Sequence, residues 1–80
     1  MTFETIKIVY PEGDEIEIER HLRVNELVDL NGNPQRLPLP TPKMIVYRVY
    51  RKSTSQTNNG PVISYHLEQL DINETYELSI

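Results

Sequence analysis

The sequence predicts one small all-β domain over residues 1–80, with five to six mostly antiparallel strands in a strongly curved sheet or a partly open barrel. Apolar and polar residues alternate with a period of two through most of the chain, the pattern of half-buried strands. Turn-forming residues separate the alternating runs. Because 80 residues are too few for an ordinary two-layer sandwich, one curved sheet buries a core more economically.

The first two alternating runs predict a hairpin. Residues 5–10 place three apolar side chains on one face, and residues 15–19 place Ile16 and Ile18 inward between outward glutamates. Residues 11–14, Pro-Glu-Gly-Asp, have the composition of a tight turn.

Residues 22–30 fit neither the helical nor the strand period. One alternative is a short helical turn with Asn25 as its N-cap. The other is a strand that enters a hairpin at Asn31-Gly32, which we favour because Asn-Gly is a strong two-residue turn signal. Pro34 follows at once, so the returning strand is expected to be irregular or at an edge.

A proline-rich segment, residues 34–43, holds four of the six prolines. Proline fixes φ and removes a hydrogen-bond donor, so this segment is expected to be extended but outside the sheet interior. We predict a crossover at the end or edge of the sheet, with Leu37 and Leu39 covering the open end of the core.

Three further strands are expected in the second half of the chain. Residues 44–51 form the strongest candidate, residues 62–70 are its partner, and residues 75–80 alternate again with Tyr76, Leu78 and Ile80 inward. The polar run 53–59 between the first two is expected to be a mobile loop.

The basic charge of the chain is concentrated in its middle third. Residues 31–60 carry no acid and five bases, namely Arg36, Lys43, Arg48, Arg51 and Lys52. The net charge of −4 argues against general coating of DNA, but a local basic surface is compatible with it.

Tyrosines lie within this basic block, and the mixture resembles in residue type the pairing used for single strands of nucleic acid, where rings stack on bases and guanidinium groups meet phosphates. Arg48, Tyr50, Arg51 and Lys52 are therefore the candidate residues for binding an anion or a partner. On an ideal strand, however, Arg48 and Tyr50 share one face while Arg51 lies on the other. The alternative is that the arginines pair with acids on neighbouring strands.

No catalytic, metal or cofactor site is expected. Ser64, His66 and Glu68 have the residue types of a hydrolytic triad, but alternate positions on a strand stand ~7 Å apart. The chain has two histidines, no cysteine, and three glycines in separate turns, so neither a metal cluster nor a phosphate-binding loop can be assembled.

Together these observations predict a non-catalytic interaction module that binds a protein partner or itself, as a homodimer for example. The alternative is a module that binds single-stranded nucleic acid or another anionic ligand through residues 47–52. No apolar run approaches the ~20 residues that span a bilayer, and no signal peptide is evident, so we expect no membrane partner. The absence of disulfides in so small a chain favours the cytoplasm.

Overall fold

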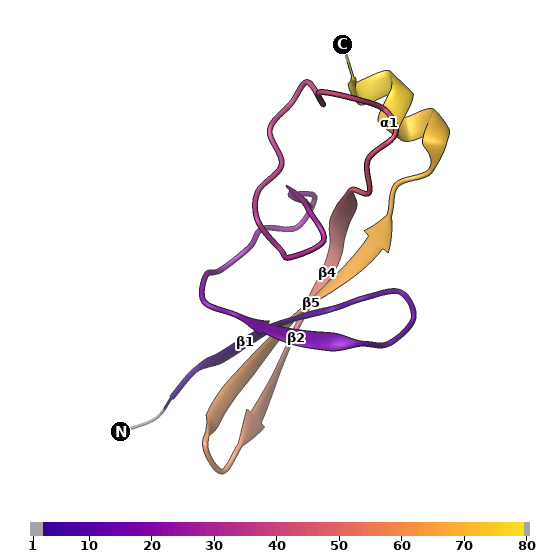
Figure 1. The fold of residues 1–80 in the computed structure, drawn as a ribbon. Helices are drawn as coiled ribbons and strands as arrows, with labels where there is room; N and C mark the ends of the chain where they lie inside the picture. Colours follow the sequence, from indigo (N-terminus) through magenta and orange to yellow (C-terminus); the bar gives the residue numbers. More distant parts are fainter. Residues whose placement is uncertain (1–2, 80) are drawn as a thin grey trace.

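The computed structural model describes residues 3–79, which form a strongly curled, half-barrel sheet of five strands with one short helix at an end (Figure 1). The strands lie in the order β2-β1-β5-β4-β3. The elements are β1 (Thr5–Val9), β2 (Glu15–Ile18), β3 (Leu27–Val28), β4 (Tyr47–Thr57), β5 (Gly60–Gln69) and α1 (Ile72–Leu78). The predicted fold class, a small β fold built on one curved sheet, is confirmed.

The predicted N-terminal hairpin is present as β1 and β2. Ile6 lies opposite Ile18, and Ile8 lies opposite Ile16. Ile18 packs against the core as predicted, whereas Ile16, also predicted to point inward, is 39% exposed. β1 also lies parallel to β5. The other three pairings are antiparallel, in agreement with the expected mostly antiparallel sheet.

The main core lies on the inner face of the sheet. Its buried members are Ile6, Ile8, Tyr10, Leu22, Val28, Tyr47, Val49, Ile63, Tyr65 and Leu67. Tyr47 and Val49 therefore mark the inner face of β4, and the ring of Tyr47 packs edge-on against that of Tyr10. A tyrosine held in this way cannot stack on a ligand.

A second, smaller core lies at the end of the sheet that carries α1. It consists of Leu39, Val46 and Leu70, with Leu78 of the helix packed against them. Leu39 is fully buried, as expected for a residue that covers the core, whereas Leu37 is 54% exposed. Residues 34–43 join β3 to the neighbouring β4, and their role as a crossover stays a prediction.

The prediction of a strand over residues 75–80 is wrong, because residues 72–78 form the helix α1. Asp71 caps the helix: its Oδ1 accepts the Glu74 amide at 2.8 Å, and the Glu74 carboxylate accepts the Asp71 amide at 3.2 Å. This reciprocal pair stabilises a helix start and outweighs the period-two pattern. Tyr76 is exposed rather than inward, and Ile80 lies outside the described residues.

The prediction of a loop over residues 53–59 is also wrong. β4 continues to Thr57 and β5 starts at Gly60, so the two strands form one long hairpin with a two-residue turn. Gly60 has a φ of +117°, which glycine adopts without strain. The polar composition of this run reflects strands that face solvent, not an irregular segment.

The alternatives for residues 22–30 are decided in favour of the hairpin. β3 covers Leu27 and Val28, and Val28 forms an antiparallel bridge to Pro34 across the turn. The Asp29 amide donates to the Asn33 carbonyl at 2.9 Å. The returning segment, which carries Pro34, forms only this single bridge and no strand, in agreement with the irregular geometry expected after the turn.

Candidate functional site

A β-bulge at Tyr50 changes which residues of β4 share a face. Val49 lies opposite Leu67, yet Arg51, two residues later, lies opposite His66, only one residue further along β5. Tyr50 is the extra residue, and a bulge of this kind reverses the alternation beyond it. The expectation that Arg48 and Arg51 occupy opposite faces is therefore wrong, because both lie on the outer face of the sheet.

Arg48 is held by two carboxylates. Its Nε donates to Glu68 Oε1 of β5 at 2.8 Å, and its Nη2 donates to Glu74 Oε2 of α1 at 2.9 Å. These hydrogen bonds, with Glu68 the larger contributor, raise the pKa of Arg48. Arg48 therefore connects β4 to β5 and to α1. It pairs with acids of neighbouring elements, as the alternative interpretation of the arginines expects, and its charge is balanced by them.

Arg51 has different surroundings. Its Nη2 lies 3.3 Å from Nε2 of His66, and Ser53 Oγ lies 2.9 Å from the same nitrogen. Burial of the ring and, next, the charge of Arg51 lower the pKa of His66. Tyr50 is 50% exposed, with its ring centre 6.3 Å from that of His66. A cation and an exposed aromatic ring thus lie together on the outer face.

Lys52 extends from the other side of β4, opposite Tyr65, and its side chain is exposed. Within residues 3–79 it forms no ion pair. Of the four candidate residues, Tyr50 and Arg51 thus lie together on the outer face. Arg48 is paired with two carboxylates, and Lys52 lies on the opposite face of β4.

Sequence reasoning missed the contact between Ser53 and His66. Ser64, His66 and Glu68 alternate on one strand, whereas the hydroxyl that contacts His66 belongs to Ser53 of the neighbouring strand. Only the register of β4 against β5 reveals this contact, and the bulge that sets the register has no signature in the local residues.

The most extended feature of this region is the open edge of β4. β3 pairs with β4 only at Tyr47 and Arg48. Just beyond, Val49 exchanges hydrogen bonds with the backbones of Asn25 and Glu26, at 2.7 and 3.0 Å. From residue 51 to residue 57, no strand among residues 3–79 lies beside this edge.

This part of β4 belongs to the hairpin with β5 that projects from the sheet (Figure 1). The molecule is correspondingly elongated, with extents of 46 × 21 × 16 Å. The open edge is therefore accessible along its whole length.

The register identifies the backbone groups that face outward. The two-residue turn makes Thr57 and Gly60 a hydrogen-bonded pair, and Gln56 lies opposite Pro61, which has no N–H to donate. Because the two kinds of pair alternate along an antiparallel ladder, Lys52, Thr54 and Gln56 direct their N–H and C=O groups away from β5.

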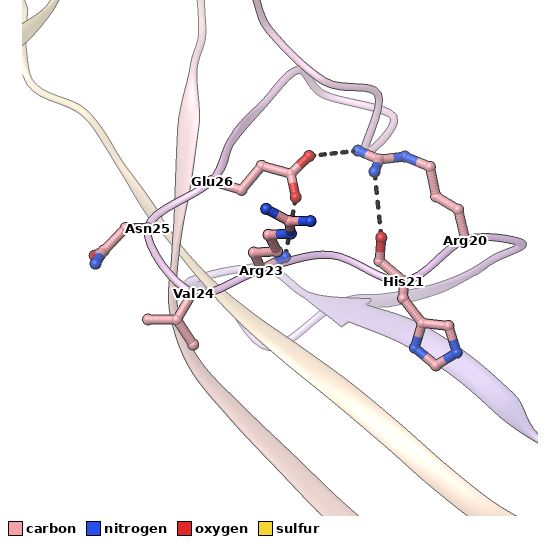
Figure 2. A pocket seen from close by; sticks show the side chains of 6 residues that line it. All are labelled: Arg20, His21, Arg23, Val24, Asn25 and Glu26. Carbon is pink, nitrogen blue, oxygen red and sulfur yellow. Dashed lines mark hydrogen bonds and ion pairs between the residues drawn. The ribbon is translucent and has the colours of Figure 1, made fainter.

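A shallow hollow of about 600 Å³ lies at the inner end of this edge (Figure 2). It is lined by Arg20, His21, Arg23, Val24, Asn25 and Glu26. Arg20 Nη2 donates to Glu26 Oε2 at 3.0 Å, and the Arg23 amide donates to Glu26 Oε1 at 2.9 Å. These contacts use the polar groups of the hollow to brace the loop that pairs with Val49.

Neither a metal site nor a membrane span is found in the part of the chain that the structure describes. No group of three or more potential metal ligands comes together within residues 3–79. In the same range, no helix is long and apolar enough to cross a membrane.

A family model described as "Uncharacterised Treponema protein" matches residues 2–78. The chain belongs to this family. No curated protein and no solved structure matches it. Since the family description names no activity, ligand or partner, the function has to be inferred from the geometry of the chain itself.

Proposed function

We propose that this chain is a non-catalytic interaction module, which binds a protein partner or a second copy of itself through the open edge of β4. The observation that carries the proposal is the row of outward-facing backbone groups at Lys52, Thr54 and Gln56. An open edge of this kind accepts an added strand, because each outward residue offers one donor and one acceptor to an extended segment.

The chemistry of the edge favours a reversible contact. Its side chains are mostly Ser, Thr and Gln, so backbone hydrogen bonds, at about 0.5–1.5 kcal/mol each, supply most of the attraction. Association costs roughly 4–15 kcal/mol in lost freedom. The balance predicts a transient complex, and the lack of cysteine in so small a chain makes the cytoplasm its expected location.

Thr54→Pro tests the proposal. Proline removes the outward N–H of residue 54 and leaves the ladder to β5 intact, because residue 54 makes no backbone hydrogen bond to β5. We expect Thr54→Pro to weaken binding by the chain about tenfold or more, and Thr54→Ala, which keeps the N–H, to retain it. Binding is measured as self-association by sedimentation and as capture of other proteins by each immobilised variant. Equal binding by the two variants, with equal thermal unfolding, would contradict the proposal.

The bulge favours a second candidate function, binding of single-stranded nucleic acid or another anion. It brings the half-exposed ring of Tyr50 beside Arg51 on one face, with Lys52 across the same strand. A stacking ring next to a cation is the arrangement that binds single strands, at about 1–3 kcal/mol per stacked base.

Fluorescence anisotropy with labelled single-stranded DNA and RNA, at low and at physiological salt, tests this candidate. Micromolar binding that weakens with salt and is lost in Arg51→Ala is the expected result. Lys43→Ala, a basic residue away from β4, is the matched control and should bind as the unaltered chain does. No binding at low salt would eliminate this candidate.

A further inference from the structure

We propose that the strand added to the β4 edge is β4 of a second copy of this chain, with the two strands antiparallel about a two-fold axis at Thr54. This inference rests on the proposed function and names its partner. The two half-barrel sheets would join into one continuous sheet through the projecting hairpins.

The sequence of the edge is nearly symmetric about Thr54. Residues 51–57 read Arg-Lys-Ser-Thr-Ser-Gln-Thr. With Thr54 opposite Thr54 of the second copy, Ser53 faces Ser55, and Lys52 faces Gln56. The outward-facing residues of one copy then meet those of the other, which gives two hydrogen bonds in each of three pairs.

Other registers use the edge less well. A shift by one residue places outward-facing groups opposite groups that already bond to β5, so the ladder cannot form. If the second copy shifts by two residues towards Val49, its Thr57 lies opposite Val49. The backbones of Asn25 and Glu26 already bond to Val49 there. A shift by two the other way loses one of the three pairs. The braced loop at residues 25–26 thus sets the register.

Charge favours the antiparallel orientation. A parallel pairing in register would place Lys52 beside Lys52 of the second copy, about 5 Å away on the neighbouring strand. In the antiparallel pairing the two lysines stand four residues apart along the strands, about 14 Å, beyond the ~8 Å screening length at physiological salt. Each basic end of the edge then faces the neutral Gln56 and Thr57 of the other copy.

Within the described part of the chain, β2 also has an unpaired outer edge, but it is a weaker partner for β4. The backbone amide of Tyr10 donates to the Asp14 carbonyl at 2.8 Å, so these two residues form a hydrogen-bonded pair. Because hydrogen-bonded and non-hydrogen-bonded pairs alternate, Glu15 and Glu17 direct their backbone groups outward from β2. This edge therefore offers two outward residues, one fewer than the edge of β4. Their charge complements Lys52. If β2 of one copy pairs with β4 of another, however, the resulting pair still has one free β4 edge and one free β2 edge, so further copies add and a filament grows. The two-fold contact uses the β4 edge of both copies and therefore stops at a dimer.

Cysteine cross-linking tests the pairing, because the chain contains no cysteine and each variant carries a single thiol. A hydrogen-bonded antiparallel pair has its Cα atoms about 5.5 Å apart, within the range of a disulfide. Under mild oxidation we expect Thr54→Cys to form a covalent dimer in the folded state and to lose this reaction in denaturant. Glu17→Cys, on the β2 edge, is the matched control and should remain monomeric. A disulfide between the two variants when mixed would instead show the contact between β2 and β4 and overturn the two-fold pairing.

Sedimentation of the unaltered chain over a range of concentrations completes the test. The mass should rise from 9.4 kDa towards twice that value, and Thr54→Pro should weaken dimerisation about tenfold or more, while Thr54→Ala should not. A monomer at every concentration, without the Thr54→Cys dimer, overturns self-pairing. If Thr54→Pro still captures less of another protein than Thr54→Ala does in that case, the edge serves a different partner and the proposed function stands. If Thr54→Pro and Thr54→Ala capture alike, both proposals fail.

Discussion

Arg48 and Arg51 lie on the same face of one strand, yet their surroundings give them different roles. Arg48 is enclosed by Glu68 and Glu74, whereas Arg51 contacts the ring of His66, whose lowered pKa favours the neutral imidazole. Of these two arginines, Arg51 is therefore the one whose charge no carboxylate within residues 3–79 balances. The sequence alone identifies both residues as candidates but cannot separate them, because their partners come from other elements.

Arg48→Ala should destabilise the chain by about 1 kcal/mol, as expected for the loss of two partly exposed ion pairs. Urea unfolding at low and at high salt measures this, and the loss should shrink at high salt because of screening. Arg51→Ala is the matched control, with an expected change within about 0.5 kcal/mol. A larger loss in Arg51→Ala than in Arg48→Ala would contradict the assignment.

At the scale of elements, local sequence signals are enough to predict the two hairpins, whereas the bulge in β4 depends on contacts between residues far apart in the sequence. The alternation of residues 5–19 and the Asn31-Gly32 signal predict the presence of their hairpins correctly because both depend on neighbouring residues. The second turn has three residues, 30–32, rather than the two expected. The bulge at Tyr50 is not predictable from the sequence, because only the register of β4 against β5 reveals it. The helix α1 was predictable in part: Asp71 followed by Glu74 is a capping signal, but the alternation of residues 75–80 suggested a strand.

Asp71→Ala should cost about 1 kcal/mol of stability, because it leaves the Glu74 amide without its acceptor. Asp71→Asn keeps an acceptor oxygen and should lose less. Urea unfolding compares the two variants. Equal losses would mean that the cap does not hold α1 over Leu39 and Leu70.

At the scale of the whole molecule, a half-barrel leaves part of its sheet open. The N-terminal hairpin, the short β3 and α1 cover the core, while the distal half of β4 has a neighbouring strand on one side only among residues 3–79. The sequence predicted a curved or partly open sheet and an interaction module, but not which edge would be free, because that depends on where β3 stops pairing. The function we propose follows from this unpaired edge of β4.

Sedimentation velocity of the unaltered chain beside Thr54→Pro and Thr54→Ala, from micromolar to millimolar concentration, tests the central claim most directly. We predict a dimer that forms with increasing concentration in the unaltered chain and in Thr54→Ala, and that Thr54→Pro needs a concentration at least about tenfold higher to dimerise to the same extent. Association that is the same in all three proteins would contradict a role for the β4 edge in it.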